Sequence, residues 1–288
     1  MRFFWTFIWD VTPLALDLFA APADTQSKHL YIVFRGTSTK AQLLSEGWFS
    51  LDPSMDFYGL GKSNKYFVNA LQILWPDVEK ALKKYSNYKV TFTGHSLGGA
   101  MASLAALKTV YKELRDKNDV ILYTFGQPRV GNVILARNHD KLVPKSFRIV
   151  HSIDIVAHLP GCEKKEIMGA SSHPCNPEHL ENPYHHGIEI YYPHEMYENN
   201  STYFECLGEP KGEDYKCSDA LTFKPEHHYQ YIYAHTHYFE HKVSTLGKLG
   251  CVGTKEEEDD LPADYGKEKK EPFRNLVKAV QFAATLFG

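Results

Sequence analysis

The stretch VTFTGHSLGGAMASLAAL, residues 90–107, joins two kinds of sequence around one serine. It begins inside a β-type run, YKVTFT (88–93), and continues into residues 97–115, where apolar side chains recur at roughly helical spacing. Between the two runs, Ser96 is flanked by three glycines, Gly94, Gly98 and Gly99. A Gly-x-Ser-x-Gly pattern between a strand and a helix predicts a sharp turn that presents the serine hydroxyl above the edge of a sheet. The N-terminus of the following helix then offers free N–H groups to an oxyanion.

Strands and helices alternate around this turn, which predicts βαβ units and a mostly parallel sheet flanked by helices. The expected strands are residues 29–37 (HLYIVFRGT, ending in a tight Arg-Gly turn), 88–93, 120–125 and 147–152. The expected helices are residues 40–48, 65–84 and 97–115, with a further amphipathic helix over 271–287. Residues 161–230 are rich in aromatic residues and histidine, and we expect them to be irregular.

The bulk composition favours a globular protein. The chain has 288 residues, of which 43% are hydrophobic and 14% aromatic, enough to build a core. The net charge of −3 gives no general field that would attract nucleic acid. The apolar run near the start, FFWTFIW, is much shorter than the roughly 20 residues that span a bilayer, so we expect no transmembrane segment.

A nucleophilic serine needs a base, and the base needs an acid to orient it. Asp154 lies in VHSIDIVAHLP just after a predicted strand, between Ile153 and Ile155, where a loop at the top of the sheet would present it. In proteins that present a nucleophilic serine on such a strand–turn–helix unit, the three groups follow along the chain in the order serine, acid, histidine. The spacing does not select the base among eight candidate histidines later in the chain: His185, His186, His194, His227, His228, His235, His237 and His241.

Four ordered segments carry a family resemblance: HLYIVFRGT, VTFTGHSLGGAMASLAAL, YTFGQPRVGN (123–132) and RIVHSIDIVAHLP (148–160). Together they resemble the class 3 lipases, the fungal-type triacylglycerol lipases, and among these the animal, nematode-like members. The resemblance covers about residues 18–251. It implies an α/β-hydrolase fold in a single domain over residues 1–251, and no cofactor.

The resemblance also implies roles for particular residues. The family's catalytic histidine lies in a segment matched here by AHTHYF (234–239), which makes His235 the base and His237 the second choice. YHHGIEIYY (184–192) is similar to a separate block that holds a non-catalytic histidine. The oxyanion hole would use the backbone N–H groups of Thr37 and Leu97.

The family places a mobile helical lid after the Arg-Gly-Thr turn. Here the segment 38–60 carries apolar side chains that are suited to cover the site in water and to open onto lipid: Leu43, Leu44, Trp48 and Phe49. The alternative is an ordinary packed helix.

The five cysteines lie in the C-terminal half and form no C-x-x-C pair, which favours disulfides in an oxidising compartment over structural zinc. The family commonly ties a C-terminal cysteine to one near the N-terminus. Cys251 matches the former, but no cysteine precedes Cys162. We therefore expect the pairs Cys162–Cys175 and Cys206–Cys217, with Cys251 left over. Only 35 residues precede Gly36, so we also expect a shortened N-terminal part.

The two ends of the chain lie partly outside the resemblance. Residues 1–23 allow two interpretations: a secretory signal that ends in an A-x-A-like site, or an ordinary strand within Leu14–Ala23. Residues 1–17 are atypical for the family under either. NNST (199–202) contains two overlapping glycosylation acceptors. Residues 252–288 hold an acidic linker, KEEEDD (255–260), before the predicted C-terminal helix, which we expect to dock on the domain surface or to touch a membrane or partner.

These observations predict a secreted serine ester hydrolase that acts on acylglycerols at an oil–water interface. Phospholipase A1 activity, hydrolysis of soluble feruloyl-type esters and a non-catalytic lipid-binding role remain alternatives. A zinc site is a further alternative, because His235 and His237 would share one face if EHHYQYIYAHTHYF (226–239) formed a strand. We expect no metal, since an H-E-x-x-H motif is absent.

Overall fold

The computed structural model describes residues 18–24, 27–36, 54–166, 174–197, 201–207, 212–214, 216–224 and 227–243. Within these residues, seven strands form one sheet in the order β1-β2-β5-β6-β8-β10-β11. Their bounds are β1 Leu18–Asp24, β2 His29–Phe34, β5 Lys89–His95, β6 Val120–Phe125, β8 Ser146–His151, β10 Ile188–Tyr192 and β11 Phe204–Cys206. The five inner strands are parallel, whereas β1 and β11 pair antiparallel at the two edges.

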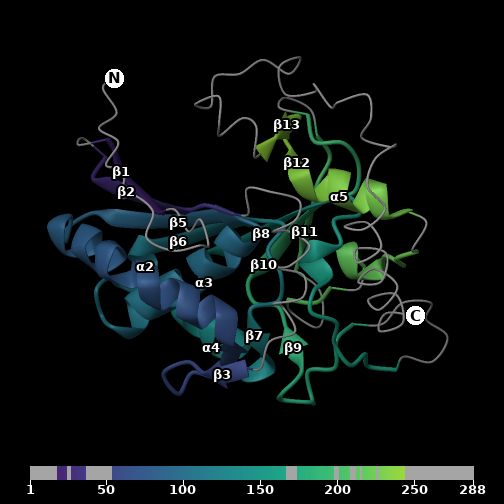
Figure 1. The fold of residues 1–288 in the computed structure, drawn as a ribbon, viewed down its shortest axis with the longest axis horizontal. Helices are drawn as coiled ribbons and strands as arrows, with labels where there is room; N and C mark the ends of the chain where they lie inside the picture. Colours follow the sequence, from purple (N-terminus) through teal and green to yellow (C-terminus); the bar gives the residue numbers. More distant parts are fainter. Residues whose placement is uncertain are drawn as a thin grey trace.

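Three helices pack on one side of this sheet (Figure 1). They are α2 Lys65–Lys84, α3 Leu97–Tyr111 and α4 Val133–Leu142. The α2 helix begins where the Asn64 side chain accepts hydrogen bonds from the N–H groups of Tyr66 and Phe67. Buried apolar residues at helical spacing, such as Leu71, Leu74 and Val78, then face the core.

The α3 helix is buried on almost all sides. Glycine and alanine occupy much of its sequence, so it fits tightly against β5 and β6 while α2 lies outside it. Met101, Leu104 and Leu107 on α3 meet Phe92 of β5 in the main core cluster. Because parallel sheets bury their faces under helices, this packing fixes the strand–turn–helix unit that carries Ser96.

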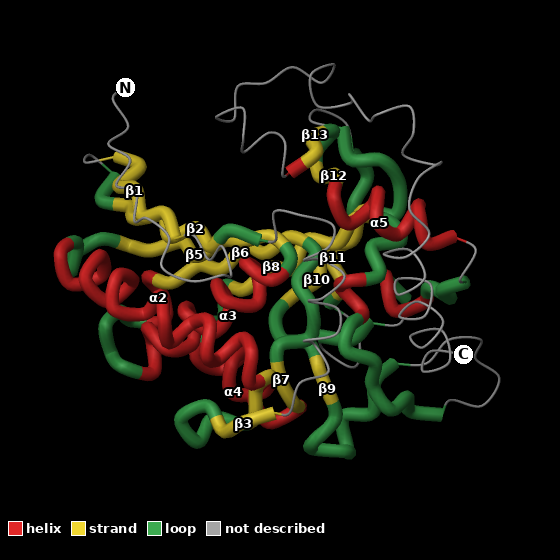
Figure 2. Tube along the Cα trace, in the orientation of Figure 1, coloured by secondary structure: helices red, strands yellow, loops and turns green. Residues whose placement is uncertain are grey.

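Smaller elements complete the described fold. The short sheet strands are β3 Ser54–Asp56, β4 Lys62–Asn64, β7 Gly131–Asn132 and β9 Pro183–Tyr184, with the hairpin β12 His237–Tyr238 and β13 His241–Lys242. The helix α5, His228–Thr236, precedes that hairpin, and 3₁₀ turns occupy Lys117–Asp119, Val156–His158 and Ser218–Ala220. Among the described residues between β8 and β10, most lie in loops (Figure 2).

The sequence predicted four of the five inner strands and α2 closely, but two expectations were wrong and one helix was missed. The predicted helix over 97–115 ends at Tyr111. Residues 161–230 are not irregular throughout, because β10 and β11 extend the main sheet. The α4 helix was not predicted. Residues 18–24 pair with β2, which fits the strand interpretation of the N-terminal region. The predicted helices over 40–48 and 271–287, the linker 255–260 and residues 1–17 lie outside the described residues.

Two disulfides join the loops in the second half of the chain, Cys162–Cys175 and Cys206–Cys217. These are the pairs expected from the resemblance. Cys251 lies outside the described residues. No helix among the described residues has the length and apolar character needed to cross a bilayer.

Candidate active site

Ser96 lies on a strained turn between β5 and α3. Its backbone has φ 55° and ψ −126°, a left-handed conformation that a serine rarely adopts. The turn is held because the Ser96 N–H donates to the carbonyl of Phe125 on β6 (2.9 Å). A Cβ on Gly98 would lie 2.2 Å from the carbonyl oxygen of Phe34, and one on Gly94 would lie 2.3 Å from the Gly98 backbone. The glycines therefore allow strand and helix backbones to touch at the turn.

The structure brings the three sequence-predicted residues Ser96, Asp154 and His235 together. The Ser96 hydroxyl lies 2.9 Å from His235 Nε2, and His235 Nδ1 lies 2.9 Å from both carboxylate oxygens of Asp154. All three side chains are buried. Asp154 follows the end of β8 and His235 comes from the last turn of α5, so the carboxyl ends of two strands and one helix meet at this point.

Asp154 is equipped to remain ionised. Burial opposes its charge, but the nearby His235 charge and hydrogen bonds from His235 and Tyr238 outweigh burial and hold the Asp154 pKa below its usual value. The Tyr238 hydroxyl donates to Oδ2 at 2.7 Å, and the Val156 N–H donates to Oδ1 at 2.9 Å. The anionic Asp154 can therefore orient the imidazole and stabilise its protonated form.

Sequence reasoning missed Tyr238, although it lies in the same AHTHYF segment as His235. The signal was the spacing: Tyr238 follows three residues after His235, beyond the end of α5. It also missed Gly126, whose φ of +55° lets the chain pass beside the acid and the base. A Cβ there would lie 2.5 Å from Asp154 Oδ2 and 2.9 Å from His235 Nδ1.

The expected oxyanion hole is described only in part. Leu97 begins α3 directly after Ser96, so its N–H lies at the helix N-terminus beside the nucleophile. Thr37 and the expected lid residues lie outside the described residues: Leu43, Leu44, Trp48 and Phe49. Gly36, before Thr37, packs against the site, because a Cβ on it would lie 2.5 Å from the His95 carbonyl oxygen.

Three of the other histidine candidates have partners of their own. His185 Nε2 lies 2.6 Å from the carbonyl of Ala157, and His186 Nε2 lies 2.7 Å from Ser103 Oγ, so both serve the protein interior. His237 stacks on Tyr233 and bonds its carbonyl. The geometric premise of the zinc alternative was wrong, because His235 lies in α5 and does not share a strand with His237.

A candidate metal cluster elsewhere consists of Glu189, Cys206 and Cys217 among the described residues. Its two cysteines form a disulfide, so their sulfur atoms are not thiolate ligands.

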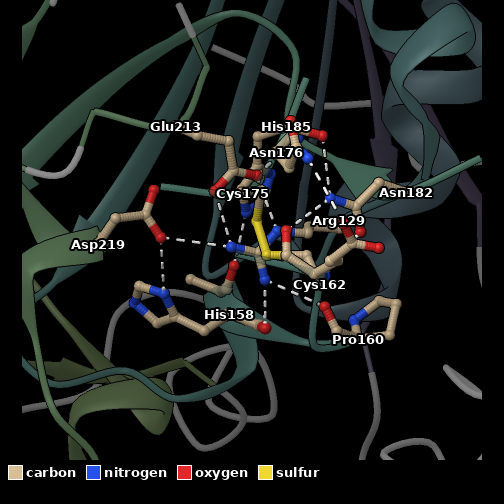
Figure 3. Close-up of a disulfide and its surroundings, with 12 residues drawn as sticks. Arg129, His158, Pro160, Cys162, Cys175, Asn176, Asn182, His185, Glu213 and Asp219 are labelled. Carbon is tan, nitrogen blue, oxygen red and sulfur yellow. Dashed lines mark hydrogen bonds and ion pairs between the residues drawn. A yellow bond between two sulfur atoms is a disulfide. The ribbon is translucent and has the colours of Figure 1, made fainter. Parts of the chain in front are cut away.

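A buried ion network holds the loop that follows Asp154 (Figure 3). Arg129 forms a two-pronged ion pair with Glu213 (2.7 Å for each bond) and approaches Asp219 at 3.3 Å. The same guanidinium donates to the carbonyls of His158 and Pro160. Arg129 thus links the loop that follows Asp154 to Glu213 and Asp219.

Comparisons with known proteins agree with this geometry. A family model described as lipase (class 3) matches residues 31–164. A lipase of Caenorhabditis elegans is 45% identical over 231 residues, which are 78% of this chain and 65% of that protein. The chain is thus similar to the class 3 lipases over most of its length. It spans slightly less than two thirds of the length of this curated relative.

Solved structures support the same assignment of fold. The lipase from Rhizopus microsporus var. chinensis superposes with a TM-score of 0.60 at 26% identity, covering 82% of this chain and 74% of that chain. A triacylglycerol lipase whose catalytic centre is a serine protease triad gives a TM-score of 0.59 at 26% identity, covering 82% and 80%. The predicted α/β-hydrolase fold, with its mostly parallel sheet, is thereby confirmed for this chain.

Proposed function

We propose that this protein is a class 3 lipase, a secreted serine ester hydrolase that cleaves acylglycerols through an acyl-enzyme. One observation carries the proposal: His235 Nε2 lies 2.9 Å from Ser96 Oγ while Nδ1 of the same ring is bound to Asp154. This is the relation that a nucleophile, a general base and an orienting acid need.

Each residue has a defined part in the reaction. Ser96 Oγ attacks the ester carbonyl as its proton moves to His235 Nε2, and Asp154 stabilises the resulting imidazolium. The N–H groups of Leu97 and Thr37 hold the oxyanion, a contribution of roughly 3 kcal/mol for each donor. His235 then protonates the leaving alcohol. Water, activated by the same imidazole, cleaves the acyl-enzyme and regenerates Ser96.

Two further observations support the substrate class and the location. Lipases are the named relatives, and the chain matches their family model over the segment that includes Ser96 and Asp154. The two disulfides suit an oxidising compartment outside the cytosol. Lipid or ester at an interface is therefore the substrate that we propose.

The test uses wild type and Ser96→Ala with a series of p-nitrophenyl esters and an emulsified triglyceride. We expect wild type to hydrolyse both kinds of substrate, with a rate increase once the ester passes its solubility limit. A serine-directed phosphonate should label Ser96 and stop turnover. Activity that survives in Ser96→Ala would contradict the mechanism, and a wild type that binds lipid without turnover would favour the non-catalytic alternative. A preference for phospholipid or soluble esters would correct the substrate.

A further inference from the structure

The helix that carries the base ends immediately after it, and its terminal carbonyl groups need donors. The last four carbonyls of an α-helix have no partner within the helix. In α5 these include the carbonyls of Ala234 and His235. Both accept hydrogen bonds from histidines of the central sheet, of which His151 is buried and His95 half-buried. His95 Nε2 lies 2.6 Å from the His235 oxygen, and His151 Nδ1 lies 3.1 Å from the Ala234 oxygen.

The second histidine also reaches beyond the helix. His151 Nδ1 lies 2.7 Å from the carbonyl oxygen of His237, the first residue of β12. One imidazole N–H therefore spans the point where α5 becomes the hairpin. The backbone on both sides of His235 is tied to the sheet through these two side chains.

Their places in the chain link the base to the other two members of the site. His95 is the last residue of β5 and directly precedes Ser96. His151 is the last residue of β8, and its carbonyl accepts the backbone N–H of Asp154 at 3.0 Å. His95 is thus joined to the nucleophile by a peptide bond, whereas the backbone of His151 is hydrogen-bonded to that of the acid, Asp154.

We propose that His95 and His151 are positioning residues that hold segment 234–237 in register with Ser96 and Asp154. This inference rests on the proposed hydrolase function. Neither side chain has a role in proton transfer or in binding the oxyanion: each acts only through the backbone beside His235. Both rings also pack edge-on against Tyr238, the residue that donates to Asp154.

A neutral imidazole suits this task. Burial, followed by repulsion from a charged His235, lowers the pKa of His95 to about 3, so His95 stays uncharged at neutral pH. Its ring centre lies 4.6 Å from that of His235. A lysine or arginine donor at this distance would oppose the imidazolium that forms during the reaction, whereas a neutral N–H satisfies the carbonyl without that repulsion.

The two histidines use different ring nitrogens, which permits a crossed experiment. The amide nitrogen of glutamine is as many bonds from the backbone as His Nε2, and that of asparagine matches His Nδ1. His95→Gln and His151→Asn therefore retain a donor at the required position. His95→Asn and His151→Gln are matched controls that are equally polar but place the donor wrongly.

We expect kcat per active site, counted by phosphonate titration, to fall about 10- to 100-fold in His95→Asn and His151→Gln, because small misplacements of a catalytic group have effects of this size. His95→Gln and His151→Asn should remain near wild type. KM should not change in any of the four, because neither histidine is placed to bind substrate. If both members of each pair keep the wild-type kcat per titrated site, the two histidines are merely structural and the proposal is overturned.

A spectroscopic measurement separates this inference from the proposed function. The Nδ1 proton of His235, shared with Asp154, should give a low-field proton NMR signal in Ser96→Ala, which cannot turn over ester. We expect His95→Gln to keep this signal in that background and His95→Asn to shift or lose it. An unchanged signal in His95→Asn would overturn the positioning role. A wild type without esterase activity would instead contradict the proposed function, whatever the signal does.

Discussion

Gly126 shows at the scale of one residue how little space the site leaves. It follows β6 with a φ of +55°, and its missing side chain makes room for Asp154 and His235. Any Cβ would displace the carboxylate or the imidazole, because the nearest oxygen would lie only 2.5 Å away. The backbone conformation adds a separate penalty for a residue with a side chain.

We expect Gly126→Ala to reduce kcat by roughly 100-fold or more, since displacement of a catalytic group by about 1 Å has effects of that order. The measurement is hydrolysis of a soluble p-nitrophenyl ester. Gly59→Ala is the matched control: Gly59 also has a positive φ, 72°, but a Cβ there meets nothing within 4 Å. Gly59→Ala therefore carries the energetic cost of a positive φ but brings no Cβ into collision with other atoms. Equal activity of the two variants would show that the collision has no effect.

Tyr238 supports the acid with a single hydroxyl. Its donation to Asp154 Oδ2 at 2.7 Å helps to keep the Asp154 pKa low. Because a hydrogen bond to a charged group contributes about 1.5–3 kcal/mol, we expect Tyr238→Phe to lower kcat by roughly 10-fold or more and to leave KM unchanged. Tyr58→Phe, at a partly exposed tyrosine of the β3–β4 connection, is the control. A Tyr238→Phe enzyme with full kcat would mean that the hydroxyl is dispensable for orienting Asp154.

At the scale of elements, the sequence predicted the features that depend on neighbouring residues, namely the turn at Ser96 and the strand that precedes Asp154. The glycines around Ser96 point to a turn because strand and helix meet there: a Cβ on Gly94 would lie 2.3 Å from the Gly98 backbone, four residues along the chain. Asp154 was found because it follows the predicted strand that the structure has as β8. The base was different: the sequence offered eight candidate histidines after Asp154, and only the resemblance distinguished His235 from the others.

Long-range contacts explain what the sequence did not predict. The strand β10 has an alternating burial pattern but lies in a loop-rich region, and its pairing with β8 settles its conformation. His95 and His151 gain their roles from carbonyls more than 80 positions away. Arg129, in YTFGQPRVGN, is defined by carboxylates that are equally distant in sequence. The hydrophobic periodicity of a sequence does not indicate partners so far apart in the chain.

Arg129 yields a prediction about the loop that follows Asp154. Arg129→Met leaves Glu213 and Asp219 buried without their cation, so we expect a loss of about 3–5 kcal/mol in the free energy of unfolding. Urea denaturation measures this loss. Lys62→Met breaks the exposed pair with Glu181 and should cost less than about 1 kcal/mol. Similar losses in the two variants would show that the buried network is no stronger than a surface ion pair.

At the scale of the whole molecule, buried titratable groups link folding to pH in opposite directions. Burial lowers the pKa of His95 to about 3 and holds that of His185 well below its reference value of 6.5. Burial raises the pKa values of Glu189 and Glu213 above their reference value of 4.5. From pH 6.5 downward the unfolded chain binds protons at the histidines that the folded protein rejects, which destabilises the fold on acidification. Above pH 4.5 the unfolded glutamates release protons that the folded protein retains, an opposing effect.

These effects offset each other between about pH 4.5 and 6.5, so wild-type stability should change little there. It should fall below pH 4.5, where the histidines and low-pKa carboxylates such as Asp154 and Asp219 still respond. The variant His185→Gln isolates the contribution of His185 to the pH dependence of the free energy of unfolding. Glutamine keeps a donor for the Ala157 carbonyl but cannot titrate, so the destabilisation of the variant relative to wild type should shrink by about 1.4 kcal/mol for each pH unit below 6.5.

Urea unfolding of His185→Gln and wild type at several pH values from 4.5 to 6.5 tests this expectation. His185 faces Arg148 and Arg129, which oppose its protonation further, whereas the nearby Asp219 favours it. If Asp219 prevailed, the folded protein would hold the proton on His185, and the difference between variant and wild type would not vary with pH. His194→Gln provides the comparison, because His194 is exposed and unfolding changes its surroundings little. A pH-dependent difference at His185 together with a constant one at His194 is expected only if the folded interior keeps His185 neutral.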